Sequence, residues 1–137
     1  KFTGAGILFT ALDADGLRHV LLARRKSGVW SISGGKASIR DADHQETAWR
    51  ETEEEFGVPL DRGTFLFEQR YPFGLGGFDW TTLVHQLPVI TDPSVFPNPH
   101  ARDFHREFTE ARWFPISQTP PKTHILLLPI LLRLRKG

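Results

Sequence analysis

A short acidic segment, Arg50 to Val58, carries the side chains of this sequence that are best suited to chemistry. At about 100° per residue along a helix, Glu51, Glu54 and Glu55 fall within one narrow arc. Three carboxylates on one face repel each other unless a cation neutralises them. Mg²⁺ is a hard cation that prefers oxygen ligands and typically works beside substrate phosphates. The acidic face therefore predicts a site for Mg²⁺ (or Mn²⁺) in phosphate chemistry.

The opposite side of the same helix is suited to packing against a core. Its residues are Ala48, Thr52 and Phe56. A solvated helix face would also explain the glutamates, but such a face requires no glycines at fixed offsets. Here Gly34 and Gly35 precede the helix, and Gly57 follows it. These offsets favour a chemical site over a solvated face.

The whole stretch resembles the Nudix box, G-x5-E-x7-R-E-U-x-E-E-x-G-U, where U is aliphatic. The residues that match in register are Arg50, Glu51, Glu54, Glu55, Gly57 and Val58. Asp41 takes the first acidic position, and the spacer from Asp41 to Arg50 is one residue longer than usual. Thr52 occupies the first aliphatic position, and Ser33 replaces the usual proline before the glycine pair. The longer spacer with an aspartate is similar to the coenzyme A pyrophosphatase branch.

The resemblance implies an α/β fold, an α/β/α sandwich with a central mixed β-sheet, in which residues 1–137 form a single domain. It implies Mg²⁺-dependent hydrolysis of a diphosphate linkage in a nucleoside diphosphate joined to another moiety. A nucleoside triphosphate, a nucleotide sugar, a dinucleoside polyphosphate and coenzyme A are all open as substrates. The alternative is a non-catalytic Nudix-fold sensor that binds nucleotide, although such domains usually lose the box glutamates. An RNA cap or 5′-triphosphate hydrolase has no basic stripe to support it.

The same resemblance assigns roles to residues of the box. The implied metal ligands are Glu51, Glu54, Glu55 and the carbonyl of Gly35. Arg50 is expected to form an ion pair that holds the carboxylates in place rather than to touch the substrate. The implied catalytic residues within the box are therefore Glu51, Glu54 and Arg50.

Two aspartates precede the acidic face. Asp41 matches the first acidic box position by its offset from the glycine pair, and a turn residue before the helix is an equally good interpretation. Asp43 is typical of an N-cap, with Glu46 as its capping-box partner. Gly57 lies where a C-cap glycine belongs. These signals predict a helix from His44 to Phe56.

The general base is not fixed by the box, because family members use a glutamate in the helix or one from a distant loop. Glu107 and Glu110 lie late in the chain, near where that loop carboxylate often sits, and His105 is a rival. Each would otherwise be a solvated loop residue. We expect Glu107 to be catalytic, in a segment that borders the substrate pocket together with the loop from Pro88 to Phe104.

Basic and aromatic residues supply candidate substrate contacts. Arg24 and Arg25 end a predicted strand just before the box, where their guanidinium groups could bind phosphates. Trp30 and Phe73 fall in predicted loops, where their rings could stack on a base. Trp80 lies on a predicted strand face, which favours packing in the core.

Other patterns place these residues on strands and loops. The predicted strands are Gly4 to Leu12, His19 to Arg25, Thr64 to Arg70, Phe78 to Leu87 and Glu110 to Phe114. Residues 27–33 predict a loop that leads to the glycine pair, and residues 71–77 predict a glycine-rich hairpin connection. The four prolines and missing periodicity of residues 88–104 predict a long surface loop.

Composition restricts the class of protein. The chain has 137 residues, of which 39% are hydrophobic and 24% are charged, as in an ordinary globular domain with a real core. Its net charge of +1 gives no strong signal for nucleic acid or an anionic membrane. The partner we expect is a small nucleotide-like molecule. The absence of cysteine excludes disulfides and thiolate chemistry, and it is compatible with the cytoplasm, where we expect the protein.

Residues 125–132 form the one membrane-like stretch, and they are far fewer than the ~20 that a span needs. The basic residues Arg133, Arg135 and Lys136 follow it, where a helix dipole favours positive charge. We therefore expect a terminal helix packed on the sheet and no membrane contact. A dimer contact, which would make a homodimer, is the second alternative for this segment.

Overall fold

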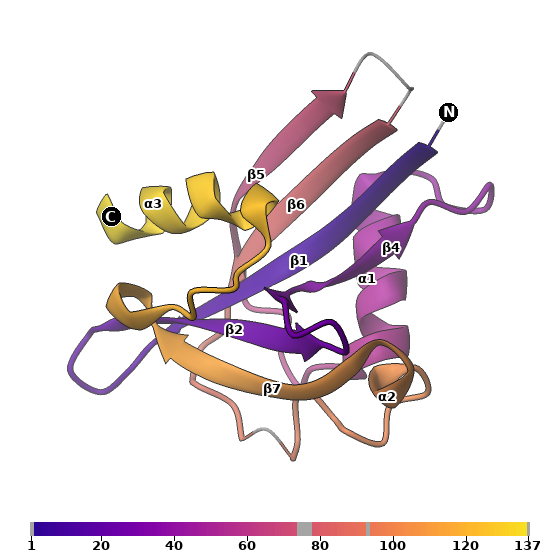
Figure 1. Cartoon of the computed structure of the whole chain (residues 1–137). Helices are drawn as coiled ribbons and strands as arrows, with labels where there is room; N and C mark the ends of the chain where they lie inside the picture. Colours follow the sequence, from indigo (N-terminus) through magenta and orange to yellow (C-terminus); the bar gives the residue numbers. More distant parts are fainter. Residues whose placement is uncertain (1, 74–77, 93, 137) are drawn as a thin grey trace.

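One long strand, β1, forms the centre of the computed structural model, which describes residues 2–73, 78–92 and 94–136 (Figure 1). The strands are β1 Phe2–Leu12, β2 Arg18–Arg25, β3 Trp30–Ser31, β4 Ser33–Lys36, β5 Thr64–Phe73, β6 Phe78–Gln86 and β7 Phe108–Pro115. The helices are α1 His44–Phe56, α2 Phe104–Glu107 and α3 Leu128–Lys136, and the 3₁₀ turns are η1 Ile116–Gln118 and η2 Ile125–Leu127.

The sheet is mixed because β1 has different partners on its two edges. One edge pairs with β6 in parallel, and β5 continues the sheet beyond β6 in the antiparallel sense. The other edge pairs antiparallel with β4 near the start of β1 and with β2 near its end. β7 lies along β2. This change of partner divides the sheet and brings the glycine pair of β4 against α1.

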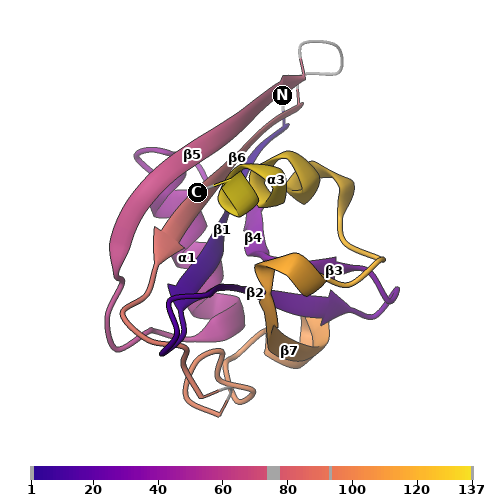
Figure 2. The same ribbon diagram turned by 90° about the vertical axis from the view of Figure 1, so that its left-hand side faces the viewer.

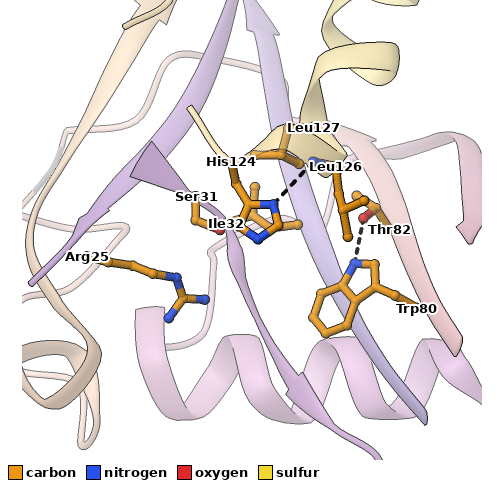
Figure 3. Close-up of a pocket in the computed structure, with 8 residues that line it drawn as sticks. All are labelled: Arg25, Ser31, Ile32, Trp80, Thr82, His124, Leu126 and Leu127. Carbon is orange, nitrogen blue, oxygen red and sulfur yellow. Dashed lines mark hydrogen bonds between the residues drawn. The ribbon is translucent and has the colours of Figure 1, made fainter. Parts of the chain in front are cut away.

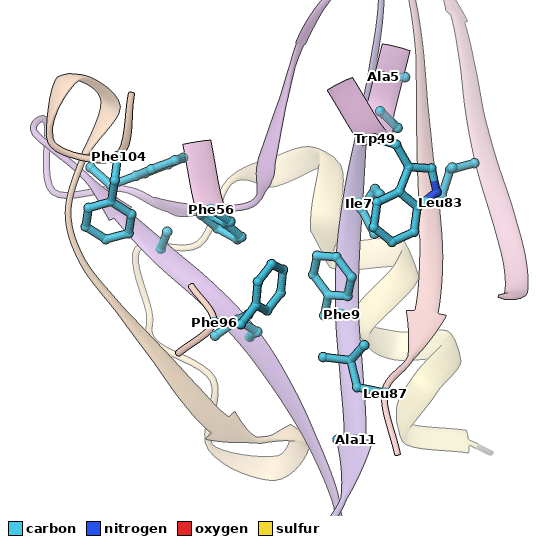
Figure 4. Packing of buried hydrophobic residues seen from close by; sticks show 14 residues of the cluster. Ala5, Ile7, Phe9, Ala11, Trp49, Phe56, Leu83, Leu87, Phe96 and Phe104 are labelled. Carbon is cyan, nitrogen blue, oxygen red and sulfur yellow. The ribbon is translucent and has the colours of Figure 1, made fainter. Parts of the chain in front are cut away.

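Two cores lie on opposite faces of the sheet, because alternate side chains of β1 point to opposite sides. Ala5, Ile7, Phe9 and Ala11 face α1 (Figure 4). Leu8 belongs to the second core, together with the buried face of α3. Figures 1 and 2 show α1 and α3 covering the two faces. The predicted α/β/α sandwich with a central mixed sheet is confirmed.

The predicted boundaries of α1 are confirmed by its caps. The helix spans His44–Phe56, and the Asp43 carboxylate accepts a hydrogen bond from the Glu46 N–H at 2.9 Å. Gly57 follows the helix with a φ of 86°. The five predicted strands also form. The terminal helix is confirmed as well, because α3 buries an apolar face against the sheet. No helix in the described part of the chain is long and apolar enough to cross a membrane.

The loop prediction for residues 27–33 is wrong, whereas the described residues of 88–103 form the predicted irregular loop but are partly buried. Within residues 27–33, β3 begins at Trp30 and pairs with β2, while β4 begins at Ser33 and pairs with β1. Within the predicted surface loop from Pro88 to Phe104, Phe96 and Phe104 are buried and pack near Phe56. In both cases the partner is distant in sequence, so local patterns do not reveal it. Residues 74–77 of the predicted hairpin connection lie outside the described residues.

Candidate active site

Asp41 and Arg50 form a multiply hydrogen-bonded pair beside the start of α1. Arg50 donates to Asp41 Oδ1 through Nε at 3.1 Å and to Oδ2 through Nη2 at 3.0 Å. Oδ2 also accepts hydrogen bonds from the Ser38 N–H and the Thr47 hydroxyl, each at 2.8 Å. The Arg50 guanidinium and the Ser38 amide hold the pKa of the Asp41 carboxyl well below its usual range. Asp41 is thus both a turn residue and the partner of Arg50.

The same guanidinium also contacts the acidic face of α1. Arg50 Nη1 lies 3.0 Å from Glu51 Oε2 and 3.6 Å from Glu54 Oε2. Arg50 Nη2 donates to the carbonyl oxygen of Lys36, at the end of β4. The Arg50 guanidinium therefore links two glutamates of α1 to the end of β4, the strand that carries the glycine pair. Arg102 adds a second positive charge, 3.4 Å from Glu54 Oε2.

The two unusual box residues, Ser33 and Thr52, contact each other. Their hydroxyl oxygens lie 2.8 Å apart, and both side chains are fully buried. Either hydroxyl left alone would be a buried polar group without a partner, which is unfavourable. The two departures from the family pattern therefore compensate each other across the interface between β4 and α1.

The glycine pair is required because α1 and β1 approach β4 too closely for side chains. A Cβ added at Gly34 would lie 2.6 Å from the Cα of Gly6, and one at Gly35 would lie 2.5 Å from the Glu51 carboxylate. The Gly34 N–H donates to Glu55 Oε1 at 2.9 Å. Two carboxylates of the acidic face thus lie directly against the backbone of this turn.

The three glutamates occupy one side of α1, but they differ in exposure. The Glu51 and Glu54 side chains are 17% and 27% exposed, whereas Glu55 is 4% exposed. Burial raises the pKa of Glu55 to about 8, and the charges of Glu51 and Glu107 act in the same direction. Burial also raises the pKa of Glu51, against the effect of Arg50. Both carboxyls are therefore held partly away from water, which disfavours their ionised forms.

The chain that precedes β7 docks on the C-terminal end of α1. The Asn98 N–H donates to the Phe56 carbonyl at 2.8 Å, and the Asp103 N–H donates to the Glu54 carbonyl at 2.9 Å. These bonds satisfy carbonyls that a helix end leaves free. They also place α2 beside α1, so that Glu107 is half-buried and close enough to influence the pKa of Glu55.

The other two candidates for the base lie differently. His105 is exposed and packs edge-on against Phe104. Glu110 accepts a hydrogen bond from Arg112 at 2.7 Å on β7. Of the three candidates, Glu107 is the one whose charge contributes to the pKa of Glu55.

The two candidate arginines of β2 have separate locations. Arg25 lines a cavity beside the box, and its charge opposes the rise in the pKa of Glu55. Arg24 donates to the Thr109 hydroxyl at 3.4 Å and is not among the described residues that line this cavity. Adjacent strand residues point to opposite faces, so only one of the pair faces the cavity.

The aromatic candidates are also separated. Trp30 packs edge-on against Phe114 with ring centroids 4.9 Å apart and joins the second core. This packing gives no support to stacking on a substrate. The side chain of Phe73 lies outside the described residues. Trp80 was expected in the core, but it is half-buried and lines the cavity.

Sequence reasoning missed this cavity, which encloses about 170 Å³ (Figure 3). Its lining residues are Arg25, Ser31, Ile32, Trp80, Thr82, His124, Leu126 and Leu127. One sequence signal was available. Gly4 and Gly6 lie on one face of β1, and a Cβ at Gly4 would come within 2.9 Å of the Trp80 ring. Alternate glycines in a strand indicate such a close approach.

The cavity and the acidic face are neighbours. A Cβ at Gly34 would lie 3.0 Å from the Trp80 ring, and the Gly34 N–H is bonded to Glu55. Arg25 lines the cavity and acts electrostatically on Glu55. Gly34 and Arg25 therefore connect the cavity to the acidic face of α1.

The donor set of the acidic face fits a hard divalent cation. Among the described residues, no three acidic or histidine side chains converge on one point, because Glu54 pairs with two arginines and Glu55 with the Gly34 N–H. All the groups nonetheless offer oxygen, and the Glu51 carboxylate lies against Gly35. Burial is the main cause of the raised pKa values of Glu51 and Glu55, and a bound cation would favour the ionised form of both carboxyls.

A glutamate-bearing helix thus lies beside a glycine turn on an α/β/α sandwich, as the resemblance to the Nudix box implies. The sequence model described as the NUDIX domain matches residues 3–133. The chain therefore belongs to the Nudix family.

Solved structures agree with this fold. A Nudix hydrolase from M. smegmatis, RenU, is 24% identical, with a TM-score of 0.73 over 98% of this chain and 83% of its own. An Ap4A hydrolase from C. elegans is 15% identical, with a TM-score of 0.72 over 99% of this chain and 96% of its own.

A third structure is a bifunctional NMN adenylyltransferase/ADP ribose pyrophosphatase from Francisella tularensis, in complex with AMP and a manganese ion. It is 18% identical, with a TM-score of 0.69 over 98% of this chain and 42% of its own. Among curated proteins, no sequence matches this chain.

Proposed function

We propose that the protein is a Mg²⁺- or Mn²⁺-dependent hydrolase that cleaves the diphosphate linkage of a nucleoside diphosphate joined to another moiety. The observation that carries this proposal is the shared border between the acidic face of α1 and the cavity. Gly34 and Arg25 form that border. A charged diphosphate and an uncharged ring-like group on one molecule would match these two adjacent environments.

In this mechanism Glu51, Glu54, Glu55 and the Gly35 carbonyl would hold the cation. When bound, the cation neutralises charge on the phosphoryl oxygens, which is the main requirement of phosphoryl transfer. Arg50 acts as a positioning residue, because its contacts are with Asp41, the glutamates and the Lys36 carbonyl. Because burial raises the pKa of Glu55 to about 8, its carboxyl would have to lose a proton to act as a metal ligand.

Glu107 is the proposed general base. It is half-buried beside Glu55, where it would take a proton from the water that attacks one phosphorus. The P–O bond to the bridging oxygen then breaks, and this oxygen leaves with the electron pair. Arg25, at the border of the cavity, would bind a phosphate oxygen through a charge-assisted hydrogen bond.

The names of two similar structures support a nucleotide substrate. One is an Ap4A hydrolase, and the other is an ADP ribose pyrophosphatase that holds AMP and manganese. The alternative of a non-catalytic nucleotide sensor has less support, because Glu51, Glu54 and Glu55 are all present and lie together on α1.

The test is a screen of nucleoside triphosphates, nucleotide sugars, dinucleoside polyphosphates and coenzyme A with Mg²⁺ and with Mn²⁺. Products are identified by mass, because cleavage of the diphosphate leaves a nucleoside monophosphate or its equivalent. EDTA should abolish turnover, and added Mg²⁺ or Mn²⁺ should restore it. Full activity in EDTA, or no turnover of any diphosphate, would refute the proposal.

A further inference from the structure

His124 stands out among the residues that line the cavity, because one nitrogen of its ring accepts a hydrogen bond from the backbone, which determines where the ring carries its own hydrogen. The Leu126 N–H donates to His124 Nδ1 at 3.2 Å, just before η2 (Figure 3). Nδ1 must therefore be the unprotonated nitrogen, and the neutral ring carries its hydrogen on Nε2. Burial and the nearby Arg25 lower the pKa of His124, which favours this neutral form. The cavity wall thus presents an N–H donor with a defined tautomer.

The position of this donor is fixed by bonds on both sides. The backbone N–H of His124 donates to the Trp30 carbonyl at 2.8 Å, and the backbone N–H of Trp30 donates to the Lys122 carbonyl at 2.7 Å. The Tyr71 hydroxyl donates to the Leu126 carbonyl at 2.7 Å. Strands β3 and β5 therefore hold the segment that carries the imidazole, so the ring is placed by a rigid scaffold rather than by a free loop.

The other polar groups of the cavity are mostly donors. Arg25 carries only N–H groups, and the Thr82 hydroxyl oxygen already accepts the Trp80 indole N–H at 2.9 Å. The Ser31 hydroxyl can donate or accept. None of the described lining residues carries a carboxylate or a carboxamide. A ligand that presents an amino group here would find few acceptors, whereas one that presents a carbonyl oxygen would find several donors.

The apolar walls fit a flat ring. Ile32, Trp80, Leu126 and Leu127 supply them. A dry cavity of ~150 Å³ admits a benzene ring, so the 170 Å³ of this cavity accept an aromatic ring of similar or slightly larger size. The hydrogen bond to Thr82 fixes the orientation of the Trp80 indole.

We propose that His124 is a specificity-determining residue whose Nε2–H binds an exocyclic carbonyl oxygen, so that the cavity selects oxo-bases over amino-bases. This inference rests on the proposed function, because it identifies the ring of the nucleotide substrate as the group in the cavity. The preference arises from a hydrogen bond made by one base and from an unpaired amino group on the other. Sites that hydrogen-bond a ligand group discriminate strongly against ligands that lack it.

The test compares binding of inosine 5′-monophosphate and adenosine 5′-monophosphate, whose bases differ in the 6-oxo and 6-amino groups. Calorimetry is done in saturating Mg²⁺, which offsets the repulsion between phosphate and the glutamates, and the result does not depend on turnover because a monophosphate has no diphosphate linkage to cleave. We expect about tenfold tighter binding of the inosine compound, as one hydrogen bond of ~1.4 kcal/mol would give. If the hydrolase screen fails, the binding preference can still be measured, so the two proposals are tested separately. If the screen succeeds but the two nucleotides bind equally, only the inference about His124 is refuted.

Three variants separate recognition from structure. His124→Asn keeps an oxygen that can accept the Leu126 N–H, but its shorter side chain withdraws the donor, so the preference should fall to within about twofold at an unchanged melting temperature. His124→Ala should lose both the preference and some stability. Ile125→Ala changes an exposed neighbour, 72% accessible, and should keep both. Equal affinities in the wild type, no binding of either nucleotide, or a preference retained in His124→Asn would each overturn the proposal.

Discussion

The acidic face of α1 and the cavity beside it are built in contrasting ways. The acidic face and the glycine pair beside it come from positions 34 to 51 and the next turn of the same helix. Arg50 forms ion pairs with three of the carboxylates in this stretch. The cavity is largely apolar and draws its wall from β2, β3, β6 and the segment before α3. The comparison teaches that the proposed metal site depends on local sequence, while the proposed base and the proposed selectivity depend on distant segments.

Removal of one carboxylate from the acidic face should have the largest effect on turnover. Glu54→Gln should lower turnover by several orders of magnitude with the fold retained, because each ~1.4 kcal/mol added to the barrier is a factor of ten. The matched control is Glu53→Gln on the same helix, whose partner is the exposed Arg62. Steady-state kinetics on the substrate found by the screen measures both. Near wild-type turnover by a folded Glu54→Gln protein would refute the metal assignment.

Glu55 should make the stability of the metal-free protein depend on pH. Its pKa is about 8 in the folded protein and near 4.5 in the unfolded chain, so the folded state binds the proton more tightly. This contribution is fully present below pH 4.5 and is lost as the pH rises to 8 and above, about 5 kcal/mol in total.

Urea unfolding at intervals from pH 4.5 to 8.5 measures this loss. Glu55→Gln can still accept the Gly34 N–H, and the difference between the two proteins isolates Glu55 from other titrating groups. Saturating Mg²⁺ should reduce the slope of the wild type, because the cation favours the ionised carboxylate. Parallel curves for the wild type and Glu55→Gln would show that Glu55 titrates normally.

Glu107 tests whether the docked segment contributes to the acidic site. Glu107→Gln should lower kcat about a hundredfold, the lower part of the range for a general base, with little change in KM. The acid limb of the pH–rate profile should move as well. Glu110→Gln, which changes a residue paired with Arg112, is the control. An unchanged kcat and pH profile in Glu107→Gln would assign the base to a glutamate of α1.

The buried hydroxyl pair tests how α1 is fixed to β4. Thr52→Val should destabilise the protein by about 1–3 kcal/mol, because it leaves the Ser33 hydroxyl buried without its partner. The double variant Ser33→Ala/Thr52→Val should lose less than the sum of the two single variants. Denaturant unfolding of the four proteins gives the coupling, and strict additivity would mean that the two hydroxyls act independently.

The adjacent arginines of β2, Arg24 and Arg25, test whether the cavity contributes to substrate binding. Arg25→Ala should raise KM about tenfold, the loss of one charge-assisted hydrogen bond to phosphate. Arg24→Ala should leave KM within about twofold, because its side chain contacts Thr109 and not the cavity. Equal effects in the two variants would show that substrate extends over both faces of β2.

The sequence predicted the elements whose signals are local. The caps Asp43 and Gly57 determine where α1 begins and ends, and a 3.6-residue period then places the glutamates on one side of it. The apolar run Gly4 to Leu12 predicts the strand that becomes β1, although it does not show which side chains face which core. These properties follow from backbone geometry over a few residues, whereas the resemblance to the family came from the residues of the box in register, Arg50, Glu51, Glu54, Glu55, Gly57 and Val58.

The tertiary structure decided the contacts between residues far apart in the chain. It turned Asp41 into the partner of Arg50, buried Glu55, and joined the two unusual box residues in one hydrogen bond. It also placed Trp30 in a core and Trp80 at a cavity with His124, which had no recognised motif. Such pairings depend on sheet register and on how the layers pack, and neither is encoded within a short window of sequence.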